Sequence, residues 1–178
     1  MIILLGKTAS GKDTIVNYLV NNLGYKKLIT YTTRPMRPGE VQKLQYHFIS
    51  EEDFQEKISH GFFLEYKTYH TEFGDWYYGS AMEDYEKADN KTVVILTPEG
   101  YLDLLWKIKN IQHDAIYIKA DILELQQRLI KRGDDKKEAE RRLVHDNKDF
   151  EYVEDIVDRI IINQNKTIEE VIDEIIKG

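Results

Sequence analysis

The stretch Gly6-Lys7-Thr8-Ala9-Ser10-Gly11-Lys12-Asp13-Thr14 follows an apolar run and precedes a segment whose apolar positions repeat at helical spacing. A strand, a glycine-bounded loop and a helix form the context in which a G-x-x-x-x-G-K motif binds phosphate. Gly6 and Gly11 permit backbone angles that let consecutive N–H groups converge on one phosphate. The helix N-terminus and the Lys12 ammonium add positive charge. The sequence therefore predicts a phosphate-binding loop, rather than a glycine-rich turn with a surface lysine.

Length and composition indicate one soluble globular domain. The 178 residues are 42% hydrophobic and 32% charged, enough apolar residues for a sizeable core. No apolar stretch has the length of a membrane span, and residues 1–5 are too short and lack the cationic leader of a signal peptide. The absence of cysteine excludes disulfides and thiolate metal sites. We therefore expect a cytoplasmic protein with no membrane partner.

The distribution of charge favours a small phosphorylated ligand over nucleic acid. The formal net charge is −7, which disfavours binding to a polyanion. Many of the cations nevertheless gather in two stretches, residues 34–43 and 128–142. Such local clusters of arginine and lysine suit a phosphate group.

Strand and helix signals alternate along most of the chain, which predicts right-handed βαβ units and a mostly parallel sheet in an α/β fold. Residues 30–80 break this alternation with mixed, hairpin-like strands, and the prolines and glycine of residues 30–40 predict a loop. The predicted strands are 2–5, 25–29, 46–49, 62–69, a short strand with a turn in 74–79, 92–96, 115–118 and 159–162. The predicted helices after the first are 50–60, 80–87, 98–109, 122–132, one through 141–152, and 168–177.

The motifs together resemble the guanylate kinase family of nucleoside-monophosphate kinases over nearly the whole chain. The most specific part is residues 32–40, TTRPMRPGE, which is similar to the family's T-T-R-x-x-R-x-G-E signature. Tyr46, Phe48, Glu65 and the sequence YYGS at 77–80 follow in the family's order. The resemblance implies a P-loop NTPase-type three-layer α/β/α fold in a single domain, 1–178. Its implied parts are a core (1–29, 81–127 and 150–178), a small mixed-β monophosphate-binding insert (30–80) and a helical lid (about 128–149).

The expected acceptor site contains two arginines and a carboxylate. Arg34 and Arg37, three residues apart, suit charge-assisted hydrogen bonds to a monophosphate, whereas two solvated surface arginines are the alternative. The resemblance implies that Glu65 binds the N1–H and the exocyclic amine of guanine, a donor pair that adenine lacks. Exposure on an alternating strand is the alternative for Glu65. The resemblance implies GMP contacts at Thr30, Arg34, Arg37, Tyr46, Glu65, Tyr78, Gly79, Ser80 and Thr97.

The resemblance also implies ATP, with Mg²⁺, as phosphoryl donor. The implied ATP contacts are Gly6, Thr8, Ala9, Ser10, Gly11, Lys12, Asp13, Thr14 and Asn163. The implied catalytic residues are Lys12, Arg34, Arg132 and Arg142. Arginines on a mobile lid would neutralise the transferring phosphoryl group and exclude water. Ion pairs of Arg128 and Arg132 with Glu124 and Asp134 on an exposed face are the alternative, and roles for Arg128 and Arg141 stay open.

Two positions depart from the family's pattern. Asp13 directly follows Lys12, where Ser or Thr usually holds magnesium, so Thr14 is the expected metal ligand. After the strand at 92–96 the family has D-x-D, and Thr97 occupies the position of the second aspartate. The residues that place Mg²⁺ are therefore left open.

The implied activity is ATP-dependent phosphorylation of GMP and dGMP to GDP and dGDP by direct in-line transfer. A broader (deoxy)nucleoside-monophosphate kinase of viral type fits the phosphate loop equally well, and the role of Glu65 distinguishes the two. A catalytically inactive guanylate-kinase-like binding module is the other alternative, although such modules typically lack a working phosphate loop. The sequence leaves a monomer and a homodimer equally open.

Overall fold

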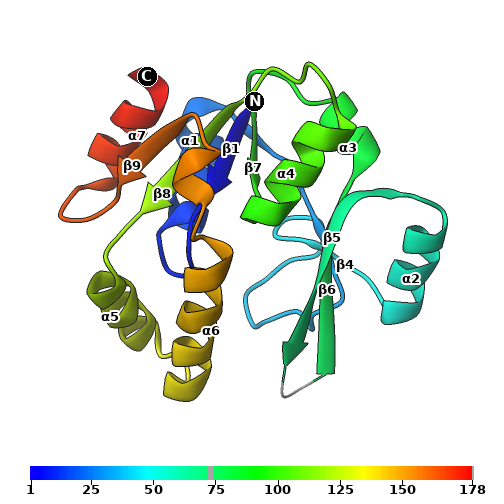
Figure 1. Cartoon of the computed structure of the whole chain (residues 1–178), viewed down its shortest axis with the longest axis horizontal. Coiled ribbons are helices and arrows are strands. Elements are labelled where there is room, and N and C mark those ends of the chain that lie inside the picture. Colours follow the sequence, from blue (N-terminus) through cyan, green and yellow to red (C-terminus); the bar gives the residue numbers. More distant parts are fainter. Residues whose placement is uncertain (72–73, 178) are drawn as a thin grey trace. The chain divides into compact units, whose positions relative to one another are not determined.

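The computed structural model describes residues 1–71 and 74–177 (Figure 1). The chain divides into two compact units. Unit 1 comprises Met1–Lys27, Asn90–Glu99 and Gln112–Gly178, and unit 2 comprises Leu28–Asp89 and Gly100–Ile111. The prediction assigned residues 81–127 to the core, whereas 81–89 and 100–111 group with unit 2. The finer division into core, insert and lid stays a prediction.

Unit 1 contains a five-stranded sheet in the order β2-β7-β1-β8-β9, and all of its strand pairs are parallel. All four residues of the central strand β1 are buried, as expected for a parallel strand covered on both faces. The strands are β1 (Ile2–Leu5), β2 (Lys26–Lys27), β7 (Thr92–Ile95), β8 (Asp114–Lys119) and β9 (Arg159–Ile162).

Helices α1 (Lys12–Leu23) and α7 (Ile168–Lys177) pack with the sheet of unit 1 in one apolar cluster. Leu19 of α1 and Val171 of α7 lie in this cluster and are fully buried. The other helices of unit 1 are α5 (Ile122–Arg132), α6 (Lys136–Asp149) and the short 3-10 helix η1 (Val153–Asp155). Helices α5 and α6 lie side by side (Figure 1) and share a separate cluster of Leu125, Leu129, Ala139 and Leu143.

Unit 2 contains a smaller mixed sheet in the order β4-β3-β6-β5. Strand β6 pairs antiparallel with both β3 and β5, whereas β3 and β4 are parallel. Phe54, fully buried, stacks on Phe63 with 4.4 Å between ring centroids and so fastens α2 to the sheet. The elements are β3 (Tyr31–Thr32), β4 (His47–Phe48), α2 (Glu51–Ser59), β5 (Phe63–Thr71), β6 (Gly74–Ala81) and α3 (Met82–Glu86). Helix α4 (Pro98–Lys107) begins in unit 1 and continues in unit 2.

The predicted α/β class, with a mostly parallel sheet and a small mixed sheet, is confirmed. The predicted cap of α2 is also confirmed, because the Ser50 side chain accepts a hydrogen bond from the Asp53 amide at 3.0 Å. The prediction that residues 30–40 are entirely loop is wrong, since they contain β3. A strand of two residues is too short to show the alternation that marks a strand in a sequence.

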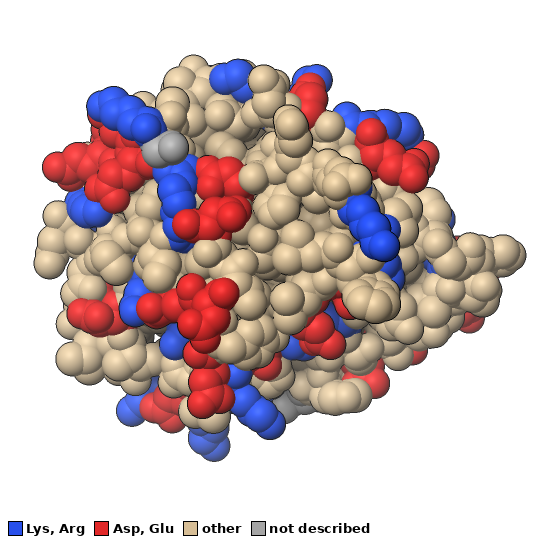
Figure 2. Space-filling model, turned by 45° about the horizontal axis from the view of Figure 1, so that its top comes forward, with Lys and Arg blue, Asp and Glu red and all other residues tan. Residues whose placement is uncertain are grey.

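The surface carries charges of both signs. On the face drawn in Figure 2, acidic and basic side chains are interspersed over a largely uncharged background. Within the described part of the chain, no helix is both long enough and apolar enough to cross a membrane.

Candidate functional site

The predicted phosphate loop lies between β1 and α1 in unit 1. Gly11 caps the start of α1 with φ +98°, a left-handed conformation that favours glycine. The Lys12 ammonium donates to the carbonyl oxygens of Gly6 at 2.6 Å and Lys7 at 3.0 Å. Burial lowers the pKa of Lys12, and the carboxylates of Asp13 and Asp146 oppose this lowering. The loop thus surrounds the Lys12 ammonium with backbone carbonyl oxygens.

Two side chains from distant segments brace this loop. The Asn163 amide, just after β9, donates to the Ser10 carbonyl at 2.7 Å. Arg128 of α5 donates to the carbonyls of Ala9 at 3.3 Å and Asn163 at 2.7 Å, and to Glu124 at 2.9 Å. Ala9 itself has φ +63°, a conformation that residues other than glycine rarely adopt. The predicted Arg128–Glu124 pair therefore exists, and the same arginine also supports the loop.

Helix α6 places two polar side chains on the loop. The Thr8 amide donates to Asp146 Oδ2 at 2.5 Å, and the Lys7 ammonium donates to Asn147 Oδ1 at 2.7 Å. A carboxylate oxygen thus accepts from a backbone N–H of the kind that a phosphate-binding loop presents to its ligand. Asp146 therefore occupies a position where a phosphate oxygen is expected.

The expected lid arginines share an acidic partner. Arg132 Nε donates to Asp134 Oδ1 at 2.6 Å, and Arg142 Nη1 lies 3.9 Å from Asp134 Oδ2. A hydrogen bond to Asp134 is the largest of the effects that raise the pKa of Arg132. The alternative predicted from the sequence, an ion pair between Arg132 and Asp134, is what this structure contains. Both arginines are held next to one carboxylate, within hydrogen-bonding or ion-pair distance.

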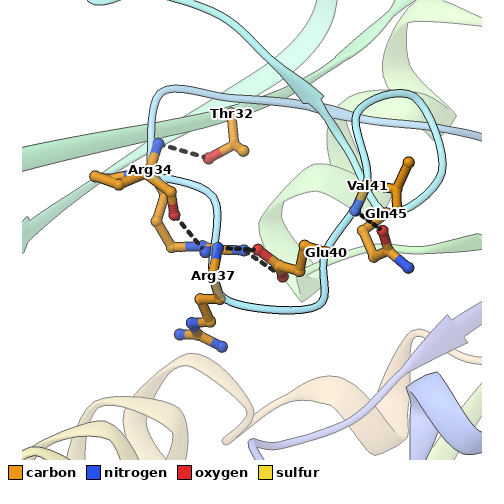
Figure 3. A network of polar contacts seen from close by, with 7 residues as sticks. Thr32, Arg34, Arg37, Glu40, Val41 and Gln45 are labelled. Carbon is orange, nitrogen blue, oxygen red and sulfur yellow. Dashed lines mark hydrogen bonds and ion pairs between the residues drawn. The ribbon is translucent and has the colours of Figure 1, made fainter.

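Unit 2 contains all the predicted acceptor residues except Thr97, and its central contact is a buried ion pair. Arg34 is only 3% exposed, so the alternative of a solvated surface arginine does not hold for it. Its Nη2 donates to both Glu40 oxygens, at 2.8 and 3.0 Å, as Figure 3 shows. The backbone N–H of Arg37 also donates to Glu40, at 2.7 Å, while the Arg37 side chain is exposed. Burial tends to raise the pKa of Glu40, but the hydrogen bonds from Arg34 and Arg37 bring it below its ordinary value.

Aromatic rings surround the Arg34 guanidinium. Its central carbon lies 5.7 Å from the ring centroid of Tyr46 and 5.5 Å from that of Phe48, within the range of cation–π attraction. The Tyr78 side chain is hydrogen-bonded to Arg34 and packs edge-on against Tyr46. The structure thus brings together three of the predicted GMP contacts, Arg34, Tyr46 and Tyr78.

The two threonines of the signature hold the start of this loop. The buried Thr32 hydroxyl oxygen accepts from the Arg34 amide at 3.1 Å (Figure 3). The Thr33 hydroxyl oxygen accepts from the Tyr77 amide at 3.0 Å, which ties the loop to β6. The Thr-Thr pair therefore fixes the backbone that leads into Arg34.

Glu65 is buried rather than solvated. It is 9% exposed, because the pairing of β5 with β6 shifts register between Phe63 and Glu65 and the simple alternation is broken. The Ser80 hydroxyl donates to Glu65 Oε1, and the Tyr85 hydroxyl donates to Ser80 Oγ at 2.9 Å. The exposed-strand alternative for Glu65 therefore fails, and Ser80 lies beside it as predicted.

The remaining predicted residues are placed as follows. Gly79 is buried and pairs with Tyr31, and the half-buried Thr30 accepts a backbone hydrogen bond from His47 at 2.8 Å. Asp13 and Thr14 are exposed in the first turn of α1. Thr97 is half-buried in unit 1, between β7 and α4.

Sequence reasoning missed three contributors to these sites. Glu40 was visible within the signature, six residues from Arg34, and its opposite charge was the available signal. Asp146 had no such signal, since it lies 138 residues from its partner Thr8 and their contact depends on tertiary packing. Tyr85 lies near Ser80 in the chain, but no motif marks its hydroxyl.

Comparisons with known proteins identify the family of the chain. The family model described as guanylate kinase matches residues 1–177. A guanylate kinase of Helicobacter pylori is 34% identical over 170 residues, covering 93% of this chain and 80% of that protein. One of Sulfurimonas denitrificans is 30% identical over 171 residues, with the same coverage. The crystal structure of guanylate kinase from Anaplasma phagocytophilum has a TM-score of 0.71 and 26% identity, covering 98% of this chain and 81% of that one. These matches do not favour a viral-type broad kinase or an inactive module, and the chain belongs to the guanylate kinase family of nucleoside-monophosphate kinases.

Proposed function

We propose that this chain transfers the γ-phosphoryl group of ATP directly to GMP or dGMP, giving ADP and GDP or dGDP. Family membership supports the reaction, and the observation that carries the residue assignment is the buried carboxylate of Glu65. A buried carboxylate that accepts hydrogen bonds matches the two donors on the guanine edge. An adenine edge would leave it unpaired, which penalises the wrong base.

On the donor side, Lys12 and the loop amides bind the outer phosphates of ATP. Lys12 releases the Gly6 and Lys7 carbonyls and turns to phosphate oxygens. Arg132 and Arg142 leave Asp134 to stabilise negative charge on the transferring group, the task that arginines perform in phosphoryl transfer. Asn163 and Arg128 hold the loop backbone in place during this exchange.

On the acceptor side, Arg34 and Arg37 bind the GMP phosphate, and the hydroxyls of Tyr46 and Tyr78 serve as neutral donors. Glu40 holds Arg34 in position before the ligand arrives. The acceptor phosphate oxygen is the nucleophile, so no protein side chain forms a covalent intermediate. Catalysis then consists of positioning and electrostatic stabilisation.

Magnesium is proposed to arrive with ATP, as part of the substrate. The Thr14 hydroxyl and the Asp13 carboxylate at the start of α1 are oxygen donors of the type that Mg²⁺ prefers. Among the residues described, no group of three or more His, Cys, Asp or Glu side chains could hold a metal ion. The Thr14 hydroxyl and the Asp13 carboxylate would therefore supplement phosphate oxygens as ligands of the cation. The charge of Mg²⁺ would partly neutralise the phosphates. The proposal places the enzyme in the cytoplasm, as a monomer or a homodimer.

The test is ADP formation from Mg–ATP with a panel of ribo- and deoxynucleoside monophosphates. Among the monophosphates of guanine, adenine, cytosine, uracil and thymine, we expect turnover with GMP and dGMP only, and Glu65→Gln should sharply reduce the preference for guanine. Turnover of the wild type with several bases would overturn the base-reading role of Glu65. No turnover with any acceptor would overturn the enzymatic proposal itself.

A further inference from the structure

A chain of buried polar side chains leads away from the carboxylate that we assign to guanine. Glu65, Ser80 and Tyr85 come from β5, β6 and α3, and their exposed fractions are 9%, 0% and 2%. Ser80 donates to Glu65 Oε1, and the Tyr85 hydroxyl lies 2.9 Å from Ser80 Oγ. The proposed function uses Glu65 and gives Tyr85 no role.

The direction of this chain follows from the charge of Glu65. An ionised carboxylate only accepts hydrogen bonds, so the Ser80 proton must point toward it. The Ser80 oxygen then acts as acceptor for the Tyr85 proton. Burial, and next the charge of Glu65, raise the pKa of Tyr85 well above its ordinary value, so its hydroxyl remains a donor.

The carboxylate is also confined on a second side. A Cβ atom built on Gly100 would lie 3.0 Å from Glu65 Oε2 and 3.2 Å from its Cδ, closer than most Cβ contacts. The backbone at Gly100 therefore approaches the carboxylate closely, while the Ser80 hydroxyl fixes Oε1. With both oxygens constrained, the plane of the carboxylate is set before any ligand binds.

We propose that Tyr85 is a positioning residue for guanine recognition, which holds the plane of the Glu65 carboxylate through Ser80. This inference rests on the base-reading role proposed for Glu65. Guanine presents N1–H and an exocyclic amine side by side, so a carboxylate rotated out of the base plane loses at least one of them. Tyr85 acts through Ser80 and makes no contact of its own with the base.

The experiment compares GMP with IMP, which lacks the exocyclic amine, in Tyr85→Phe and the wild type at saturating Mg–ATP. Loss of one neutral hydrogen bond should raise KM for GMP about threefold to tenfold and leave kcat nearly unchanged. The ratio of kcat/KM for GMP to that for IMP should fall by a similar factor. Tyr31→Phe is the matched control, a half-buried tyrosine of unit 2 whose ring stacks on His47, and it should change neither quantity.

A folded Tyr85→Phe protein with an unchanged GMP-to-IMP ratio would overturn the inference, even if its melting temperature falls. Ser80→Ala breaks the same chain one link nearer Glu65 and must lower the ratio at least as much. If Tyr85→Phe does not fold, the GMP-to-IMP ratio of Ser80→Ala is the test, and an unchanged ratio would overturn the inference. In the Ser80→Ala background, Tyr85→Phe should cause no further loss, because the route to Glu65 is already cut.

Glu65→Gln separates this inference from the proposed function. If Glu65→Gln keeps the wild-type ratio, Glu65 does not read the base, and the role of Tyr85 fails with it. If Glu65→Gln abolishes the preference while Tyr85→Phe retains it, only the inference about Tyr85 is wrong.

Discussion

Replacing Asp146 by alanine should tighten ATP binding, because the Asp146 carboxylate accepts a hydrogen bond from the Thr8 amide at 2.5 Å. A phosphate oxygen of ATP is expected to take the same N–H, so binding must first break this contact. Hydrogen bonds to charged groups are worth about 1.5–3 kcal/mol, and the lower figure suits a half-exposed carboxylate. A cost of about 1.5 kcal/mol corresponds to roughly a tenfold weaker ATP affinity.

We therefore expect Asp146→Ala to lower the dissociation constant of Mg–ATP about tenfold, measured by calorimetric titration without acceptor. Asp146→Asn keeps an acceptor oxygen but loses the charge, so its effect should be intermediate. Asn147→Ala is the control, since it removes a neighbouring contact to Lys7 and leaves Thr8 in place. Unchanged or weaker ATP binding by Asp146→Ala would refute the reasoning, because the carboxylate would then not compete with phosphate.

Three further substitutions test the loops. Lys12→Ala should lower kcat more than about a hundredfold with an unchanged circular dichroism spectrum; near-normal turnover would exclude its proposed role. Glu40→Gln should lower the free energy of unfolding at pH 7 by about 1–3 kcal/mol, because the buried Arg34 loses its charged partner. The pKa of Glu40 is lower in the folded protein than its ordinary value of about 4.3. The stabilisation by Glu40 is therefore fully present at a pH above that ordinary pKa, and it is lost as the pH falls through the pKa of the folded protein. The free energies of unfolding of the wild type and Glu40→Gln, measured by urea titration, should therefore become equal in acid. A difference that stays constant with pH would contradict the stabilising role assigned to the Glu40 charge. Gly11→Ala places a Cβ 2.4 Å from Asn163 Nδ2 at a residue whose φ is +98°. It should lower the free energy of unfolding by at least about 1–2 kcal/mol and lower the melting temperature. An unchanged melting temperature would show that the loop adapts to the new side chain.

The sequence could predict the elements whose signals are local. The glycine-bounded loop between β1 and α1, the Ser50 cap and the buried strands β7 and β8 each depend on neighbouring residues, and each lies where it was predicted. The burial of Glu65 could not be predicted, because it depends on a register shift that breaks the alternation of β5.

Two side-chain contacts of the candidate sites could not be predicted from the sequence either. Asp146 approaches Thr8 only because α6 folds back to the loop, and no spacing along the chain indicates it. Tyr85 reaches Ser80 because α3 follows directly after β6, and the sequence gives that hydroxyl no distinguishing context. Short motifs thus predicted candidate residues, whereas the contacts that these residues make became visible only in the structure.

The packing of α7 against α1 has a consequence for how the protein is made. The apolar face of α1 (Ile15, Val16 and Leu19) is completed by Val171, Ile172 and Ile175, which a ribosome adds roughly 150 residues later. At about 5–20 residues per second, that interval lasts on the order of ten seconds or more. Helix α1 is therefore synthesised well before the helix that completes its apolar cluster. During that interval the nascent chain has an uncovered apolar surface that chaperones can bind.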